Sequence, residues 1–288
     1  MTSCIGELTI TDKQAIKLQI KPYVQISPQL EKCCLLLSAN ESYARAAQDI
    51  EVLTGISVSH STQQRLVHRQ EFPEPVVEQM VTEISLDGGK VRLRTPKGQA
   101  CIWKDYKAVA LEHQVIAAFF RDNDALVEWV NHQPKTKIFS CIGDGHDGIW
   151  NLFAQISTDW HRFEILDWYH LVENLYKLGQ PVSWLKRVKR LLWHGKIDTA
   201  IEVLHKCRHR QAANFVIYLQ KHWLRIYNYH LLQQEGISIG SGAVESAIKQ
   251  ISRRVKLSGA QWNAANVPQL PLHRCAYLNG YFSSSLQS

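Results

Sequence analysis

The sequence predicts an α/β protein in which a mixed sheet is flanked by helices. Residues 82–120 contain short stretches in which apolar and polar residues alternate, the period of antiparallel strands. Residues 137–142 and 163–167 are short, mainly apolar runs of the kind that buried parallel strands show. Helical patterns precede, separate and follow these strands, and the longest helical stretch covers residues 181–235.

The N-terminal part is expected to contain a pair of helices after a polar, loop-like stretch in which Pro22 and Pro28 break any helix. The first helix of the pair begins at Asn40 or Ser42 and ends at Gly55, a residue type that favours the left-handed helix end. A capping box, Ser61-x-x-Gln64, opens the second helix.

Two helices joined by a short glycine turn have the outline of a helix-turn-helix motif. The second helix would then present polar side chains to DNA, namely His60, Thr62, Gln63, Arg65 and Arg69. Ordinary α-helical domains contain the same pattern, so DNA binding and plain packing are both open interpretations. Pro73 and Pro75 indicate a linker after the pair.

The predicted sheet begins with an antiparallel meander. Residues 83–87 alternate and end at Gly88-Gly89, which predicts a turn with Asp87 at the end of the first strand. Further strands are expected at residues 90–94, 103–112 and 114–120. Because Asp-Gly is common in turns, Asp87 has a structural interpretation beside a functional one.

A second aspartate follows the apolar run 137–142, in the sequence Gly143-Asp144-Gly145-His146-Asp147-Gly148, before a helix over residues 149–156. Open α/β sheets place their sites at the carboxyl ends of such strands. Asp144 is therefore the candidate. Asp147 is the alternative, with a second interpretation as a charge at the helix N-terminus.

The strand over residues 163–167 ends in Asp167, and His170 lies in the first turn of the helix that follows. This pair has two interpretations. Asp167 and His170 are either metal ligands or a helix cap beside a histidine at the edge of the core.

A glycine turn that leads into an amphipathic helix provides one further carboxylate. Gly240 and Gly242 permit a sharp turn, and Ser241 is expected to cap the helix start. Apolar residues at helical spacing then pack inward, which leaves Glu245 in the first turn beside the apolar stripe.

Positive charge is concentrated in the C-terminal part of the chain. The formal net charge is +7, yet residues 181–288 contain 15 Lys and Arg against 4 Asp and Glu. Such a distribution favours a polyanionic partner, most often nucleic acid, although solvated helix faces also carry charge. Arg253, Arg254 and Lys256 are clustered after the glycine-turn helix and are candidate DNA contacts.

Other classes of protein find little support. The seven cysteines are scattered and form no Cys-x-x-Cys pair, so neither a zinc knuckle nor a disulfide framework is indicated. The sequence contains no long apolar run and no signal-peptide pattern at its start, which predicts a cytoplasmic protein without a membrane partner.

Asp87, Asp144 and Glu245 together suit a divalent cation, because carboxylate oxygens are the ligands that Mg²⁺ and Mn²⁺ prefer. Two such ions, about 3.5–4 Å apart, stabilise both the attacking and the leaving oxygen in phosphoryl transfer. Basic surroundings are appropriate for a phosphodiester substrate.

The segments that contain these acids resemble DDE transposases of bacterial insertion sequences, of the ISKra type related to Mutator-like transposases. The similarity lies in residues 85–88, 142–152, 166–171 and 239–245, and in the later stretches 253–262 and 273–280. The resemblance implies an RNase H-like fold with an α-helical insertion between the second Asp and the Glu. It assigns metal binding and catalysis to Asp87, Asp144 and Glu245.

The resemblance also implies partners and an organisation into parts. The expected partner is double-stranded DNA, at transposon ends and target, bound by a homo-oligomer in the cytoplasm near the nucleoid. The expected parts are an N-terminal helical DNA-binding region (1–75), the first part of the catalytic core (76–170), the helical insertion (171–235) and the last part of the core (236–288).

Departures from the family define the alternatives. Transposases of this group usually have a longer N-terminal DNA-binding region, and Pro268 and Pro271 interrupt a helix that is expected to be continuous. One alternative is therefore a truncated, non-catalytic remnant that binds DNA. Another is an RNase H-like nuclease or resolvase. A further hypothesis is that His170 with Asp167 aligns DNA or orders the site.

Overall fold

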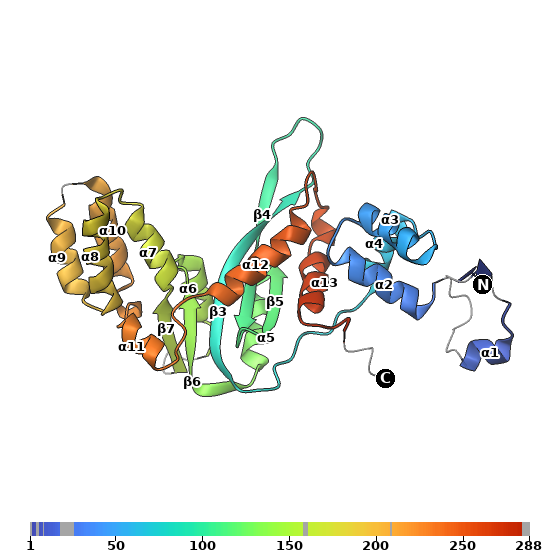
Figure 1. Ribbon diagram of the computed structural model, residues 1–288, viewed down its shortest axis with the longest axis horizontal. Helices are drawn as coiled ribbons and strands as arrows, with labels where there is room; N and C mark the ends of the chain where they lie inside the picture. The colour runs from blue at the N-terminus through green and yellow to red at the C-terminus, as the bar shows by residue number, and fades with distance from the viewer. Residues whose placement is uncertain are drawn as a thin grey trace. The chain divides into compact units, whose positions relative to one another are not determined.

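The computed structural model describes residues 2–3, 6–7, 9–17, 26–157, 161–207 and 209–283 (Figure 1). The predicted helix break at Pro22 lies outside the described residues. Contacts divide the chain into two compact units. One contains residues 76–89 and 106–248, and the other contains residues 1–75, 90–105 and 249–288.

A five-stranded mixed sheet confirms the predicted α/β class. The strands are β3 (Val81–Leu93), β4 (Ile102–Leu111), β5 (Val115–Phe120), β6 (Lys135–Gly143) and β7 (Arg162–Leu166). They lie in the order β5-β4-β3-β6-β7. Strands β4 and β5 are antiparallel, whereas β6 runs parallel to both β3 and β7. Helices α5 (Asn123–His132) and α6 (Asp147–Phe153) alternate with the later strands.

The predicted turn at Gly88-Gly89 is wrong, because β3 continues through both glycines as one strand of 13 residues. Neither glycine has a positive φ angle. The side chain of Tyr106 lies where a Cβ atom on Gly89 would be, and Lys107 Nζ lies 2.9 Å from the Cβ position of Gly88. Close approach of β4 side chains, rather than chain reversal, therefore explains the two glycines.

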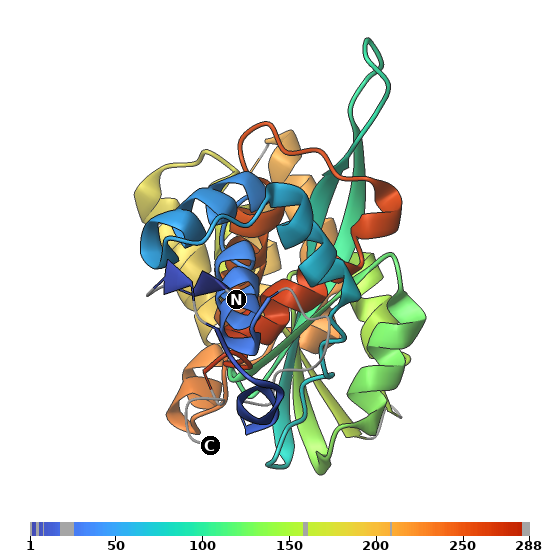
Figure 2. The same ribbon diagram turned by 90° about the vertical axis from the view of Figure 1, so that its right-hand side faces the viewer.

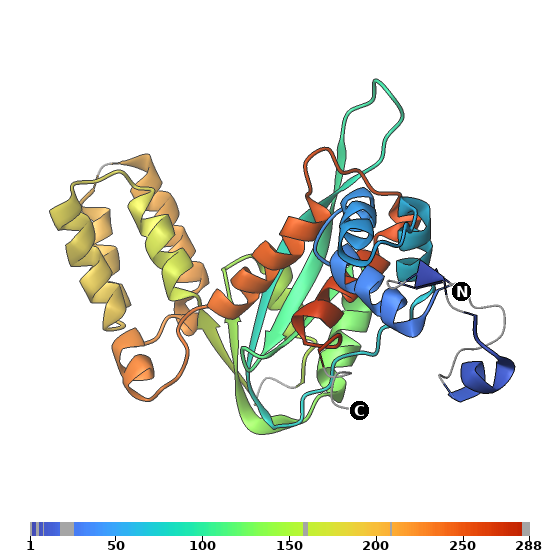
Figure 3. The same cartoon turned by 45° about the vertical axis from the view of Figure 1, so that its right-hand side comes forward.

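A helical block lies between β7 and the returning glycine-turn helix. It consists of α7 (Trp168–Tyr176), α8 (Val182–Trp193), α9 (Ile197–His205), α10 (Arg210–Lys221), the 3-10 turn η2 (Trp223–Arg225) and α11 (Tyr229–Gln234). Helix α9 contacts α8 and α10, and Figures 1 and 3 show the three side by side. Their apolar faces join the main core, which also contains residues of the sheet such as Ile84, Ile142 and Ile165.

The other unit has a smaller core of its own. Helices α2 (Pro28–Ser38), α3 (Tyr43–Thr54) and α4 (His60–Arg69) pack together, and α4 contacts α13 (Gln269–Leu278) (Figure 2). Leu35, Ile50 and Leu66 are among its buried residues. Ser42 caps α3 and Gly55 ends it with φ 69°, as predicted. The cap of α4 is Ser59 instead of the predicted Ser61.

Two further expectations about the ends of the chain need correction. Residues 1–28 are not wholly loop-like, because they include the short strands β1 (Thr2–Ser3) and β2 (Gly6–Glu7) and the helix α1 (Asp12–Lys17). The two prolines do not interrupt α13. Pro268 is its N-cap and Pro271 lies in its first turn, where a missing N–H group costs little. The turn η3 (Ala264–Asn266) precedes α13.

No described helix is long and apolar enough to cross a membrane.

Candidate functional site

Three aspartates continue the register of the three parallel strands. Ser85 on β3 is paired with Ile142 on β6, and Gly143 on β6 is paired with Leu166 on β7. Asp87 follows Ser85 by two residues, and Asp144 follows Ile142 by two residues. In the same way, Asp144 directly follows Gly143, and Asp167 directly follows Leu166. Since neighbouring strands are about 4.8 Å apart, the three residues form a row across the sheet.

Asp87 interacts electrostatically with the other acids that were predicted from the sequence. Partial burial is the main cause that raises the pKa of its carboxyl group, and the charges of Asp144 and Glu245 raise it further. The Gly88 N–H group, which donates to Asp87 Oδ1 over 2.6 Å, and the charge of His170 act in the opposite direction. Asp87, Asp144 and Glu245 therefore belong to one cluster of negative charge.

Asp144 and Asp147, the two alternatives from the sequence, have different surroundings. Asp144 Oδ1 accepts a hydrogen bond from the backbone N–H group of His146 over 2.9 Å. Asp147 is exposed at the start of α6 and forms an ion pair of 2.5 Å with Lys221 on α10. The hydrogen bond from Lys221 lowers the pKa of Asp147. Asp147 thus pairs with α10, which leaves Asp144 as the acid in the row.

Asp167 is fully buried and caps α7, as one of its two interpretations predicted. Its Oδ1 accepts from the His170 backbone N–H group over 2.8 Å, and its Oδ2 accepts from the hydroxyl group of Ser241 over 2.6 Å. Burial alone would raise the pKa of Asp167. The hydrogen bonds from His170 and Ser241 outweigh that effect, so the pKa is lowered and the carboxylate stays charged.

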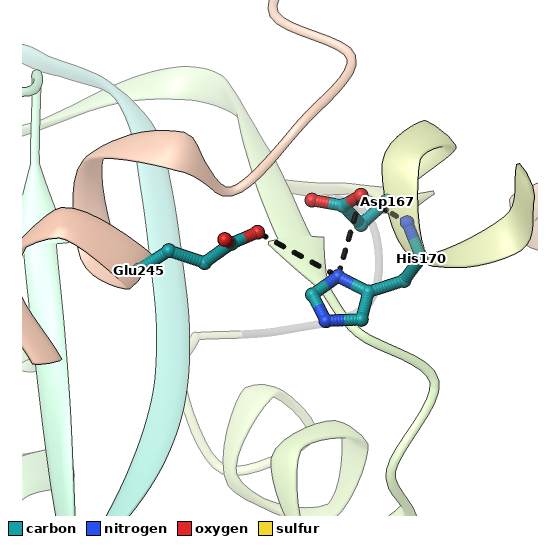
Figure 4. Close-up of side chains that lie close together, drawn as sticks. All are labelled: Asp167, His170 and Glu245. Carbon is teal, nitrogen blue, oxygen red and sulfur yellow. Dashed lines mark hydrogen bonds and ion pairs between the residues drawn. The ribbon is translucent and has the colours of Figure 1, made fainter. Parts of the chain in front are cut away.

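His170 lies between two carboxylates, as Figure 4 shows. Its Nδ1 atom is 3.4 Å from Asp167 Oδ1 and 3.7 Å from Glu245 Oε1. These contacts are longer than well-formed hydrogen bonds, so we describe them as ion pairs. The Asp167 carboxylate is the main cause that raises the pKa of His170 to about 9, against the effect of burial, and Glu245 and Asp144 add to the rise. The imidazole is therefore protonated at neutral pH.

Glu245 is positioned by the glycine turn before α12 (Gly242–Val255). Its backbone N–H group donates to the carbonyl oxygen of Ser241 over 3.0 Å, which begins the helix. Ser241, which was expected to cap this helix, directly precedes its first residue, and its hydroxyl group donates to Asp167. A Cβ atom on Gly240 would lie 2.5 Å from the ring of Tyr169, so this glycine permits close packing against α7.

The structure brings together a set of residues that differs from the predicted triad. Among the described residues, Asp167, His170 and Glu245 form a group whose ligand atoms all lie within 4.8 Å of one another. Asp87 and Asp144 are outside this group, although Asp87 is coupled to its charges. A metal ion at this group would have to displace the proton of His170, because both nitrogens of a protonated imidazole ring carry hydrogen. At neutral pH this trio is held together by charge.

Tyr218 on α10 is a neighbour of the row that sequence reasoning did not identify. Burial raises the pKa of its phenol to about 12, with added effects of the charges of Asp144 and Asp167. Its ring packs closely against Gly145, which has a φ angle of 96°. In the sequence it appears only as one more aromatic residue in an amphipathic helix, so no local signal distinguishes it.

The residues predicted to contact DNA lie in the unit that contains residues 1–75, 90–105 and 249–288, and they differ in exposure. Arg65, Arg69, Arg253 and Lys256 are exposed, and Arg69 forms an ion pair of 2.9 Å with Glu31. Arg254 is only 1% exposed. Its guanidinium group lies 5.0 Å from the ring centres of both Tyr43 and Trp262, and Nε donates to the carbonyl oxygen of Ser38. Burial thus gives Arg254 a packing role and keeps it from phosphate groups.

Comparisons with known proteins do not add to these observations. No protein-family model matches the chain, and no curated protein sequence is significantly similar to it. Any statement about function therefore rests on the residues and their arrangement.

Proposed function

We propose that this protein is a metal-dependent DNA transposase of the DDE type, which cleaves DNA strands at the ends of an insertion sequence and joins them to target DNA. Asp87, Asp144 and Glu245 would hold Mg²⁺ or Mn²⁺. The observation that carries this proposal is the position of Asp87 and Asp144 in one row and the electrostatic coupling of Asp87 to the other two acids. Asp87 and Asp144 occupy one row of the sheet. The charge of Glu245, which lies far beyond Asp144 in the sequence, adds to the effect of burial in raising the pKa of Asp87.

The architecture supports an RNase H-like core. An antiparallel pair, β4 and β5, flanks β3 on one side, and the parallel strands β6 and β7 follow on the other. The helical block from α7 to α11 separates Asp144 from Glu245 in the sequence. This is the place at which the proposed family carries its α-helical insertion.

The donor set fits a hard divalent cation. Asp87, Asp144 and Glu245 offer only carboxylate oxygens, which suit Mg²⁺ and Mn²⁺. Burial raises the pKa of Asp87, the charges of Asp144 and Glu245 raise it further, and a bound cation would relieve their repulsion. When bound, such ions would stabilise negative charge on the attacking and leaving oxygens of a phosphodiester.

Asp167 and His170 would then order the site. The charged Asp167 holds the start of α12 through Ser241 and keeps His170 protonated. The His170 cation in turn lies 3.7 Å from Glu245 and holds that carboxylate toward the row of aspartates. His170 is thus a positioning residue in this proposal, with a second role in aligning DNA as an open hypothesis.

DNA binding is assigned to the basic parts of the chain. Helices α3 and α4 would act as a helix-turn-helix, with Arg65 and Arg69 toward DNA, and Arg253 and Lys256 would add phosphate contacts. The active form would be a homo-oligomer on paired DNA ends, near the nucleoid.

Single substitutions at the three acids test the proposal. The substrate is plasmid DNA that carries the terminal repeats found beside the protein's own coding sequence, incubated with Mg²⁺. We expect nicking and strand transfer by the unaltered protein, and loss of both in Asp87→Asn, Asp144→Asn and Glu245→Gln, with DNA binding retained. Glu235→Gln, which changes an exposed acid on the helical block, is the matched control and should cut normally.

The other outcomes separate the alternatives. Near-normal cleavage by any one of the three variants contradicts the assigned site. Salt-sensitive binding without nicking by the unaltered protein identifies a non-catalytic DNA-binding remnant. A strong preference for branched over linear DNA identifies an RNase H-like nuclease or resolvase.

A further inference from the structure

Helix α8 combines a buried apolar face with an adjacent stripe of positive charge. Leu185, Val188 and Leu192 are buried in the main core. Lys186, Lys189, Arg190 and Trp193 occur at positions i, i+3, i+4 and i+7, so they share one stripe of the helix. We call this stripe the α8 cationic face. The helix contains no acidic residue.

A shallow cavity of about 370 Å³ lies on this face. It is lined by Trp168, Trp193 and the three cationic side chains. The two tryptophan rings are 4.9 Å apart, and Lys189 Nζ lies 5.9 Å from the ring centre of Trp168. Aromatic side chains thus form the apolar floor, and ammonium and guanidinium groups form the rim.

The cations of the face have no acidic partner among the residues that the structure describes. Ion pairs occur elsewhere in the helical block, for example between Lys177 and Glu173. By contrast, no such pair involves Lys186, Lys189 or Arg190 in the described part of the chain. Neighbouring like charges on one helix face repel each other, so an unneutralised stripe costs stability, and a bound polyanion would offset that cost.

We propose that the α8 cationic face binds the phosphate backbone of duplex DNA. This inference rests on the proposed function, in which DNA is the substrate. The face is near the candidate site, because Trp168 directly follows Asp167 and belongs to the same unit. Lys186 and Arg190 are one helical turn apart, a rise of about 6 Å. One DNA strand carries about two phosphates over that length, which matches the spacing of these two cations.

The tryptophan floor offers the cationic side chains an apolar surface. Long Lys and Arg side chains lay their methylene groups on apolar surface and keep the charged end in water. Trp168 is buried and cannot rotate away, so the floor is fixed. The contact of Lys189 with the Trp168 ring limits the conformational freedom that this side chain loses when a phosphate binds.

The salt dependence of DNA binding tests this inference. The full chain is titrated into a fluorescent 30-base-pair duplex in EDTA, so that cleavage cannot occur, at several KCl concentrations. For Lys186→Gln/Lys189→Gln/Arg190→Gln we expect the slope of log affinity against log salt to fall by about 2–3, with a loss of affinity of about tenfold or more at 0.1 M salt. The single variant Arg190→Gln should lose a slope of about 1.

A matched control removes equal charge from the same helical block. Lys196→Gln/Lys206→Gln/Arg210→Gln changes three exposed cations outside the α8 cationic face, and its slope should fall by less than 1. Equal losses in the two triple variants overturn the inference, because net charge alone then explains binding. Unchanged DNA binding together with reduced binding of polyglutamate also overturns it and indicates an acidic protein partner.

This test is separable from that of the proposed function. If the unaltered protein cleaves DNA but the α8 triple variant binds normally, the transposase proposal stands and the inference about α8 fails. If the unaltered protein binds DNA through α8 without cleavage, the inference stands and the catalytic proposal fails.

Discussion

The ring of Tyr106 lies against the backbone of Gly89 on the neighbouring strand, where a side chain on Gly89 would have to be. The hydroxyl group of Tyr106 also donates to the carbonyl oxygen of Ile248 in α12 over 3.4 Å. Glycine at position 89 therefore leaves room for the Tyr106 side chain. Through this side chain β4 contacts both β3 and α12, the helix that contains Glu245.

Gly89→Ala should destabilise the protein by about 1–3 kcal/mol, because the added methyl group overpacks the site occupied by Tyr106. The free energy of unfolding from urea titration measures this effect. Gly242→Ala is the control, since nothing lies within 4 Å of its Cβ position and alanine favours a helix. A Gly89→Ala protein as stable as this control would contradict the packing explanation.

Ser241→Ala should lower the free energy of unfolding by about 1–3 kcal/mol, because the buried carboxylate of Asp167 loses a hydrogen-bond donor. If the proposed function holds, cleavage should also fall, since Ser241 precedes Glu245 by one helical turn. Urea unfolding and the nicking assay measure the two effects. Ser258→Ala, at an exposed position, should change stability by less than about 0.5 kcal/mol.

His273 should make the stability of the unit that contains residues 1–75, 90–105 and 249–288 sensitive to acid. Burial, followed by the charge of Arg254, lowers the pKa of this histidine to about 3, and its Nε2 atom is 2.9 Å from the carbonyl oxygen of Leu35. The depressed pKa contributes stability that is present above pH 6.5 and is lost as the pH falls toward 3. Between pH 6.5 and 4.5 the expected loss is about 2–3 kcal/mol.

The variant His273→Gln tests this dependence. It should be less stable than the unaltered protein at pH 7, yet the difference should shrink as the pH falls from 6.5 to 4.5. Urea unfolding at a series of pH values gives the comparison, and exposed His132→Gln should keep the steep dependence. Parallel curves for His273→Gln and the unaltered protein would assign the acid sensitivity to other groups.

Arg253 and Arg254 are adjacent in the sequence and should respond to substitution in opposite ways. Arg254→Gln should cost about 2–4 kcal/mol of stability, because the buried guanidinium group stacks on Tyr43 and Trp262 and donates to Ser38. Exposed Arg253→Gln should leave stability within about 0.5 kcal/mol. It should instead reduce the salt slope of DNA binding by about 1. Similar unfolding curves for the two variants would contradict this division.

Local sequence patterns were sufficient to predict most strands and several helix ends. The apolar run before Asp144 and the mainly apolar run that ends in Asp167 are strands β6 and β7, and Ser42 and Gly55 bound α3. These features depend on neighbouring residues, which is why sequence alone reveals them. The predicted turn at Gly88-Gly89 failed because the decisive neighbour, Tyr106, lies 17 residues away on another strand.

The assembled site depended on contacts that no local pattern contains. Asp87, Asp144 and Glu245 were named from the sequence, but the alignment of the two aspartates arises from strand register, which is fixed by tertiary pairing, and Glu245 comes from helix α12. The bond between Asp167 and Ser241 joins residues 74 positions apart. Arg254 was grouped with Arg253 and Lys256 because charge is visible in a sequence, whereas burial beneath Tyr43 and Trp262 is not.

The bond between Asp167 and Ser241 has a consequence for how the chain tolerates change. The helical block departs from the sheet at one of these residues and returns at the other, so its two ends meet. The entropic cost of bringing the ends of a chain segment together grows only slowly with the number of residues in it. Here the hydrogen bond that joins the ends involves only Asp167 and Ser241. The loops of the excursion that face away from the sheet can thus vary in length, whereas α10 is constrained by the contacts of Tyr218 with Gly145 and of Lys221 with Asp147.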